Sequence, residues 1–244
     1  MKYSNMAKKL IILGICFVGF TSAQTLNPFD IGESLHYSAK INFIPAGIAK
    51  LKIKAIETVD GFETFHISFN VKSSKIIDRL FKVRDVVETW VDTKELFTRK
   101  FRKDIRERNY KNKFSATINY EDSLITTEER EFPVSQEIRD PYSMIYYLRT
   151  VPLKVGDLFS YTTFDNNKFT VFKIIVHHKE KIKVPAGKFN CFVIEPFREG
   201  KSLLKSKGNM TIWLSDDKRR LPVKIESNAS FGTMILKLKK VSVN

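Results

Sequence analysis

The sequence predicts an all-β protein whose strands are mainly antiparallel. Short segments in which apolar and polar residues alternate recur along the chain, and this is the period of a half-buried strand. Turn-forming residues separate these segments, so that about a dozen short strands fit the spacing of an antiparallel architecture. Similar segments also recur in the second half of the chain in the same order. Together these observations leave room for only one or two short helices.

The N-terminus has the features of a secretory signal peptide. Basic residues precede an apolar run at residues 10–20, and small residues follow up to Ala23. This order is typical of a signal peptide, and the run is too short to span a bilayer as a helix. We therefore expect residues 1–23 to be cleaved after Ala23, residues 24–244 to be periplasmic or otherwise exported, and no transmembrane segment to remain.

The first half of the mature chain consists of strand-like segments. Lysines alternate with apolar residues over residues 49–55, and the pair Asp60-Gly61 then predicts a hairpin turn because both residues tolerate positive φ angles. A return strand follows over residues 65–71. The segment from residue 73 to 81 indicates a short helix, and we expect these apolar residues of it to face inward: Ile76, Ile77, Leu80 and Phe81.

The clearest helical signal lies near the middle of the chain, at about residues 140–149. Asp140 is a good N-cap, and Pro141 falls at the first helical position, where a missing N–H group costs nothing. Tyr142, Ile145 and Tyr146 then follow at helical spacing. We interpret this helix as a structural brace whose aromatic face packs against the sheet.

The second half of the chain resembles the first. Gly32 to Tyr37 resembles Gly156 to Tyr161, and a tryptophan followed by an acidic turn occurs in each half. The matching order favours a tandem duplication into pseudo-repeats 30–120 and 154–244, although any antiparallel protein repeats strand and turn. Two repeats are too few for an open solenoid. We therefore expect one β-rich domain over residues 24–244 that closes as a barrel, roll or sandwich.

The mature chain is strongly basic. Removal of the three lysines in residues 1–23 leaves 39 of the 42 basic residues against 27 acidic ones, a net charge of +12. This balance favours anionic partners such as lipid headgroups or acidic polysaccharide. We expect no nucleic-acid partner, because an exported protein rarely meets one and the sequence has no nucleic-acid motif.

A candidate ligand-binding surface for such anions lies in the most charged segment, at residues 99–113. Its basic residues are Arg99, Lys100, Arg102, Lys103, Arg106, Arg108, Lys111 and Lys113. One interpretation is a docking surface for anionic lipid or polysaccharide, to which each cation contributes about 1 kcal/mol. The other is a solvated hairpin whose charges protect an edge strand from pairing, and only two aromatic residues are interleaved.

The sequence offers no local catalytic or metal-binding motif. His177 and His178 are adjacent, so on a strand they point to opposite faces and cannot readily share one metal ion. Cys191 lies in an apolar segment and is interpreted as a buried strand thiol, while Asp216 and Asp217 fit a turn. We therefore name no catalytic residue, no metal ligand and no cofactor, and we expect no enzyme, although scattered catalytic groups would escape this reasoning.

Several short motifs together resemble a known bacterial family. They are Gly32-Glu33 with Tyr37, Gly47-x-Ala49, Asp140 with Tyr146-x-Leu-Arg149, Val184-Pro-Ala-Gly-x-Phe189, and Ile212-Trp-Leu-Ser-Asp-Asp217 with Leu221-Pro-Val-Lys224. This arrangement is similar to exported proteins that share a domain of unknown function, number three-one-zero-eight in that series. The resemblance implies an envelope location and a β-rich fold, with no established activity. The tryptophan element also resembles strands of the periplasmic lipoprotein-carrier proteins.

These observations favour a non-catalytic binding or carrier module of the cell envelope. Its ligand would be apolar or anionic, a lipid or a polysaccharide, because a closed β structure can hold an apolar ligand in its interior. The first alternative is a structural or assembly factor that binds an envelope protein. A hydrolase is the third hypothesis, and a cluster of carboxylates or a contact between Cys191 and a histidine would favour it.

Overall fold

A computed structural model of the protein describes residues 28–198, 209–229 and 232–243. Within these residues, fourteen strands form one antiparallel sheet, which confirms the all-β prediction. The expected signal peptide lies outside the described residues. The strands are β1 (Glu33–Ile41), β2 (Ile44–Val59), β3 (Phe62–Ser73), β4 (Arg84–Asp92), β5 (Thr98–Glu107), β6 (Tyr110–Asn119), β7 (Leu124–Thr127), β8 (Glu131–Pro133), β9 (Leu158–Asp165), β10 (Lys168–Val184), β11 (Gly187–Phe197), β12 (Met210–Ser215), β13 (Pro222–Ala229) and β14 (Gly232–Val243).

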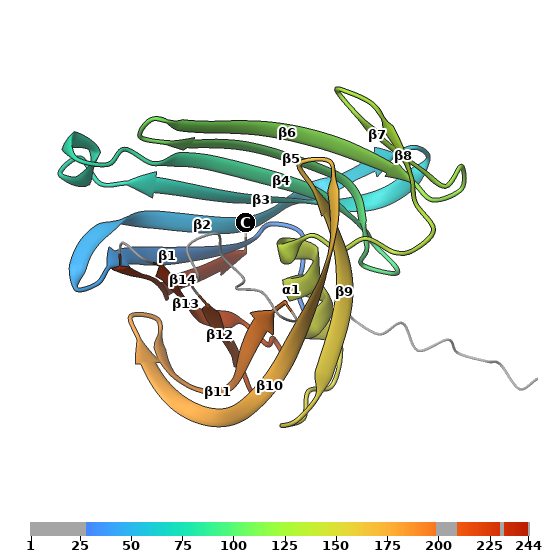
Figure 1. The fold of residues 1–244 in the computed structure, drawn as a ribbon. Helices are drawn as coiled ribbons and strands as arrows, with labels where there is room; N and C mark the ends of the chain where they lie inside the picture. Colours follow the sequence, from blue (N-terminus) through green and yellow to red (C-terminus); the bar gives the residue numbers. More distant parts are fainter. Residues whose placement is uncertain (1–27, 199–208, 230–231, 244) are drawn as a thin grey trace, which may run out of the picture.

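Strands that follow each other in the chain pair with each other, except that β8 does not pair with β9. The order in the sheet is β8-β7-β6-β5-β4-β3-β2-β1-β14-β13-β12-β11-β10-β9, so β1 pairs with β14 and joins the first half of the sheet to the second. The sheet curls so that the two halves face each other, with helix α1 (Pro141–Thr150) between them (Figure 1). This arrangement places the helix inside the curl, as expected of a brace.

The sheet is strongly curled without closing into a continuous hydrogen-bonded cylinder. Its edges, β8 and β9, do not pair with each other along a ladder. The linker before the helix joins β5 to β9 instead: Thr98 of β5 donates its N–H to the carbonyl of Ile138, and Arg139 donates its N–H to the carbonyl of Thr162 of β9, both at 2.8 Å. Lys103 of β5 also binds Asp165 of β9. The linker and these side chains therefore occupy the place of a closing ladder.

The core fills the space between the two halves of the sheet. Met144, Ile145 and Leu148 of α1 pack against inward-facing apolar residues of β10, β11 and β12. Tyr146 of the same helix packs on the opposite side into a larger cluster contributed by β1, β2, β3 and β14. The helix is therefore apolar on most of its circumference because sheet surrounds it. No helix in the described residues is long and apolar enough to cross a membrane.

The segment predicted as a short inward-facing helix at residues 73–81 differs from expectation. It contains only a 3-10 helix, η1 (Ile77–Arg79), and none of the residues of η1 is buried. Ile76 is 78% exposed and Leu80 is 74% exposed, and Phe81 is also exposed. The physical reason is the position of the segment: it connects β3 to β4 beyond the end of the sheet, where there is no core for an apolar face to cover.

Candidate functional site

The family-type motifs of the sequence meet around helix α1. Asp140 caps the helix: its Oδ1 accepts hydrogen bonds from the N–H groups of Tyr142 and Ser143, at 2.8 and 3.2 Å. Its other carboxylate oxygen accepts the hydroxyl hydrogen bonds of Thr89 and Thr98, at 2.6 and 2.7 Å. Asp140 is buried, so both oxygens need partners, and these four donors fix the start of the helix against β4 and β5.

The last turn of the helix is fixed by a buried ion pair. The two terminal nitrogens of Arg149 donate to the two carboxylate oxygens of Glu33, at 2.6 and 2.8 Å. The same guanidinium donates to the carbonyls of Arg219 and Pro28, at 3.0 and 3.2 Å. Burial alone would lower the pKa of Arg149, but the Glu33 carboxylate outweighs it and the pKa is raised. Arg149 therefore stays charged in the interior and joins three segments of the chain.

Two tyrosines complete this interior cluster. Tyr146 is fully buried, and its ring meets that of Phe29 edge to face at a centroid distance of 4.8 Å. Tyr37 of β1 donates its hydroxyl to the carbonyl of Pro222 at 2.8 Å. Motif residues that are far apart in the sequence thus meet in the packed core. We interpret them as the scaffold of the fold. The motifs are visible in the sequence, but the sequence alone does not show that their residues are in contact.

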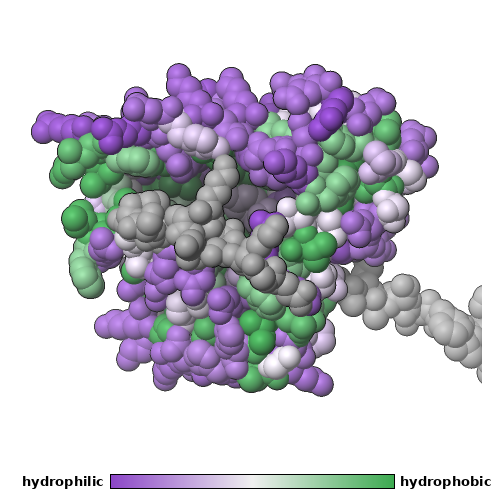
Figure 2. All heavy atoms as spheres, in the orientation of Figure 1, coloured by the Kyte–Doolittle hydropathy of each residue, from purple (hydrophilic) through white to green (hydrophobic). Residues whose placement is uncertain are grey.

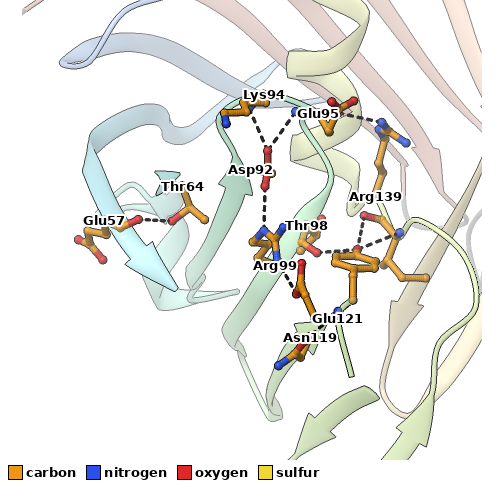
Figure 3. A network of polar contacts seen from close by, with 12 residues as sticks. Glu57, Thr64, Asp92, Lys94, Glu95, Thr98, Arg99, Asn119, Glu121 and Arg139 are labelled. Carbon is orange, nitrogen blue, oxygen red and sulfur yellow. Dashed lines mark hydrogen bonds and ion pairs between the residues drawn. The ribbon is translucent and has the colours of Figure 1, made fainter. Parts of the chain in front are cut away.

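A second buried arginine, Arg99, lies beside Tyr120, which binds the linker that leads into the helix. Arg99 of β5 donates to Asp92 at 2.8 Å and to Glu121 at 3.4 Å (Figure 3). Its guanidinium covers the ring of Phe62. Nearby, Tyr120 donates its hydroxyl to the carbonyl of Thr98 at 2.8 Å and accepts the N–H of Ile138 at 3.1 Å. The expected anion-binding residue Arg99 is therefore buried and joins β5 to Asp92 of β4 and to Glu121 after β6, while Tyr120 and Thr98 hold the linker.

The remaining basic residues of the predicted surface are divided between two faces and a tip. Lys103 is largely buried on the inner face and binds Asp165. Lys100, Arg102 and Lys113 belong to the outer face, where Arg102 binds Glu88. The other three lie at or beside the turn between β5 and β6: Arg106, Arg108 and Lys111. The structure therefore brings together only a part of the eight residues.

A cavity on the outer face of β4–β6 contains three of the predicted residues. It has a volume of about 350 Å³, and its charged lining residues are Glu88, Arg102, Lys103, Asp104, Lys113 and Glu128. The ammonium group of Lys103 binds Asp165 on the inner face, so Arg102 and Lys113 are the cations that face the three carboxylates in this cavity. An anion entering this cavity gains little net attraction, because each cation already has an acidic neighbour.

Glu88 also belongs to a polar network that the sequence did not indicate. His66 lies between two carboxylates: its Nδ1 is 2.7 Å from Glu57, and its Nε2 is 3.1 Å from Glu88. Its ring stacks on Trp90 at 4.3 Å, and the indole N–H donates to Glu57 at 2.7 Å. Burial alone would raise the pKa of Glu88, but hydrogen bonds from Arg102 and Lys54 lower it to about 2. All these groups have partners, so we interpret the network as structural.

A larger cavity lies at the end of the sheet where β2 begins and β3 ends. Its volume is about 600 Å³, within the range of small-molecule sites. Pro45, Ile48 and Ile76 give it apolar walls. Its charged lining residues are Lys72, Lys75, Asp78 and Arg84, so three cations face one carboxylate. Of the two cavities, this one combines apolar walls with an excess of positive charge.

The wall of this larger cavity is held rigidly. Asp78 accepts hydrogen bonds from Arg84 at 3.0 Å and from the hydroxyl of Ser73 at 2.5 Å. The Arg84 guanidinium, together with Ser73, lowers the pKa of Asp78 to about 2. Gly47 allows the close approach of β2 to β3, because a Cβ atom there would lie 2.2 Å from the carbonyl oxygen of Lys72. The family-type motif Gly47-x-Ala49 therefore has a physical explanation.

The other candidates for chemistry have ordinary partners. His177 lies 2.7 Å from Glu195, and Asp216 binds Lys179. Cys191 is fully buried, as predicted. Burial, followed by the nearby carboxylates of Glu180 and the Asp216 turn, raises its pKa to about 12. Among the described residues, no group of three or more histidine, cysteine or acidic side chains is arranged to hold a metal ion.

Comparisons with known proteins agree with this fold. Residues 35–239 match a family described as "Protein of unknown function (DUF3108)". The chain is similar to the crystal structure of a "Beta-barrel-like Protein of Domain of Unknown Function DUF1849" from Brucella abortus, with 11% identity, a TM-score of 0.59, and coverage of 88% of this chain and 98% of that one.

More distant matches include a protein provisionally described as a lipoprotein from Parabacteroides distasonis, with 12% identity, a TM-score of 0.38, and coverage of 87% of this chain and 96% of that one. Another is a provisionally described exported protein with a YmcC-like fold from Bacteroides fragilis, with 10% identity, a TM-score of 0.33, and coverage of 88% and 97%. The search of curated proteins found no match.

Proposed function

The chain belongs to the DUF3108 family, whose description names no activity, and from its geometry we propose a non-catalytic binding or carrier module of the cell envelope. The proposed ligand is an anionic amphiphile, a molecule with an apolar chain and a negatively charged head. The observation that carries this proposal is the cavity of about 600 Å³ at the start of β2 and the end of β3. The basic, export-type sequence supports an envelope location, with cleavage after Ala23.

The cavity suits an amphiphile because it is lined both by apolar residues and by basic residues. Ile48 and Ile76 are 60% and 78% exposed, so a bound alkyl chain would remove apolar surface from water. Lys72 and Lys75 are exposed beside them, and neither forms an ion pair within the described residues. Arg84 is already paired with Asp78. An anionic head would therefore contact Lys72 and Lys75.

A core filled by α1 changes the position at which we expect the ligand. The sequence suggested an apolar ligand in the interior of a closed sheet, but Tyr146, Leu148 and Met144 occupy that space with almost no exposure. The two cavities described above are lined largely by outer-face residues and connections. The ligand proposed here accordingly lies at one end of the sheet.

Ligand extraction and binding measurements test the proposal. Mass spectrometry of organic extracts from the purified protein should find a co-purifying anionic lipid. Short-chain phosphatidylglycerol, used below its micelle concentration, should bind, and Lys72→Gln with Lys75→Gln should weaken binding about tenfold or more, because hydrogen bonds to charged groups contribute about 1.5–3 kcal/mol each. Lys113→Gln is the matched control, since Lys113 is 73% exposed and lies at the smaller cavity, where each cation has an acidic neighbour.

Two results would contradict the proposal. One is the absence of both a co-purifying lipid and measurable binding of the short-chain lipid. The other is an equal loss of affinity in the Lys113→Gln control, which would indicate attraction to the overall positive charge alone. A stoichiometric protein neighbour in cellular cross-linking would favour the alternative of a structural or assembly factor.

We also infer that the fold arose by tandem duplication of a six-stranded unit. Strands β1–β6 and β9–β14 follow one another in the same neighbour-to-neighbour order. The indole N–H of Trp90 donates to Glu57, and that of Trp213 donates to Glu180, with 33 residues between the partners in both halves. A lysine ammonium lies near each indole ring, Lys100 in the first half and Lys224 in the second. These matched contacts support the pseudo-repeats 30–120 and 154–244.

A further inference from the structure

Three connections between strands form a continuous surface at one end of the sheet, on the left in Figure 1. They are residues 41–44 between β1 and β2, residues 74–83 between β3 and β4, and residues 106–111 between β5 and β6, and we call them the tip. Ser74 donates its N–H to the carbonyl of Ala46 at 2.8 Å, and Arg108 donates to the carbonyl of Lys82 at 2.8 Å. These hydrogen bonds join each connection to the next.

The tip exposes large apolar side chains to an unusual degree. Phe43 is 93% exposed in the two-residue turn between Ile41 and Ile44, and Ile76 and Leu80 are also mostly exposed. Apolar residues gather at this end in Figure 2, at the connections β1–β2 and β3–β4. An exposed apolar cluster on an exported protein costs solubility and typically marks an interaction site.

Rigid contacts hold these side chains outward. Asn42 adopts a positive φ of 54°, which forms the tight turn. Its N–H donates to the carbonyl of Thr233 at 2.7 Å, and its side-chain oxygen accepts the N–H of Thr233 at 2.9 Å. The turn is therefore fixed to β14, and Phe43 projects from a supported position beyond the end of the strands.

Cations surround the exposed apolar residues. The tip contains six basic residues, Lys75, Arg79, Lys82, Arg106, Arg108 and Lys111, against two acidic ones, Asp78 and Glu107, so its net charge is +4. Within the described part of the chain, Lys75, Arg79 and Lys82 form no ion pair, whereas Asp78 is paired with Arg84. The tip therefore presents uncompensated positive charge beside its apolar side chains.

We propose that the tip docks onto a bilayer surface that contains anionic phospholipid. Apolar side chains that project from turns can enter the headgroup region, and lysine and arginine around them bind the anionic headgroups. Tyr110, also exposed at the tip, suits the membrane interface because one end of its side chain is apolar and the other polar. Protein interfaces are depleted in lysine, so three lysines at the tip favour a membrane over a protein partner.

This proposal deepens the proposed function and rests on it in one respect, the source of the ligand. Lys75 and Ile76 belong both to the tip and to the lining of the larger cavity. Docking would therefore place the cavity against the headgroups, where an anionic amphiphile leaves or enters the bilayer.

Flotation of the mature chain with lipid vesicles tests the docking. The protein should float with vesicles of phosphatidylcholine mixed with phosphatidylglycerol, should remain unbound with phosphatidylcholine alone, and should be released by salt. Neutralising three cations, with Lys75→Gln, Arg79→Gln and Lys82→Gln, should weaken binding about a hundredfold, because each contributes about fivefold near an anionic surface. The control neutralises three exposed lysines that lie outside the tip: Lys94, Lys188 and Lys218.

The apolar contribution has its own pair of variants. Phe43→Ser with Leu80→Ser changes two side chains that lie outside the cavity lining, and it should abolish flotation. Val155→Ser with Leu158→Ser is the matched control, because these residues are 54% and 55% exposed and lie outside the tip, and its flotation should be unchanged. Circular dichroism of each variant confirms that the fold is intact.

Monomeric short-chain phosphatidylglycerol separates the failure of docking from the failure of the proposed function. The double variant Phe43→Ser with Leu80→Ser should still bind this monomeric lipid. Lys72→Gln should bind the monomeric lipid less tightly, but its flotation should stay within about fivefold of that of the unchanged chain. Wild-type protein that binds the monomer but never floats would overturn the docking proposal alone. Flotation without monomer binding would overturn the proposed function. Equal flotation of the tip and control variants, or a stable oligomer that buries Phe43, would also overturn docking.

Discussion

The guanidinium of Arg149 and the carboxylate of Glu33 form a two-armed ion pair in the interior, across 116 residues of sequence. Neither side chain is more than 5% exposed. Glu33 begins β1, and Arg149 lies in the last turn of α1. The pair therefore fixes the orientation of the helix relative to the sheet, and it explains why an arginine can occupy a position surrounded by the rings of Phe29 and Tyr146.

Breaking this ion pair should be much more harmful than replacing both partners. Glu33→Met and Arg149→Met should each lower the free energy of unfolding by about 3–5 kcal/mol, because each leaves the other charge buried without its counter-ion. The double variant Glu33→Met with Arg149→Met should cost less than the sum of the two single changes. Urea unfolding of all four proteins gives the coupling energy. Strict additivity would mean that the two side chains do not interact in solution.

Tyr146 should contribute to stability through its ring and not through its hydroxyl. Tyr146→Ala should lower the free energy of unfolding by about 3–5 kcal/mol, since the ring is fully buried against Phe29. The hydroxyl has no hydrogen-bond partner among the described residues. Tyr146→Phe should therefore change stability little or raise it slightly. An unchanged melting temperature for Tyr146→Ala would show that the helix is not part of the core.

Glu88 should make the protein sensitive to acid. Hydrogen bonds from Arg102 and Lys54 hold its pKa at about 2 against the opposing effect of burial, below the ordinary value of 4.5. Its contribution to stability is therefore complete above pH 4.5 and is lost as the pH falls toward 2. Glu88→Gln should be less stable than the unchanged chain at neutral pH, and the difference should disappear near pH 2.

Urea midpoints across this pH range measure the effect of Glu88. Asp78 also has a pKa lowered to about 2, so acid still destabilises the Glu88→Gln protein to some extent. The informative quantity is the difference between the two proteins at each pH. A constant difference from neutral pH to pH 2 would contradict the assignment.

Cys191 should be unreactive in the folded protein. Burial raises its pKa to about 12, and its side chain is fully buried in β11, so neither thiolate nor access is available. Ellman's reagent should label a chain that lacks residues 1–23 only after addition of denaturant, and then at one thiol per chain. Rapid labelling of the native protein would contradict the position assigned to β11, and Cys191→Ala provides the blank.

Local features of the sequence predicted the elements that depend on local chemistry. Asp140 and Pro141 predicted the start of α1, because capping and a missing N–H group act within one turn. Asp60 and Gly61 predicted the β2–β3 turn, and both have positive φ angles. The buried strand position of Cys191 followed from its apolar neighbours. The prediction of a short helix at residues 73–81 with buried apolar residues was wrong, because helical spacing identifies an apolar face without showing whether a core lies opposite it.

The sequence by itself determined an all-β chain with one capped helix, a basic charge and no local catalytic motif. Only the tertiary structure decided what those residues do, because curling the sheet brings together side chains that are far apart in the chain. It buried Arg99 and Lys103, two residues expected at an anion-binding surface, in ion pairs. It also placed Ile76 and Leu80 in solvent and joined their connection to the basic β5–β6 turn through Lys82 and Arg108.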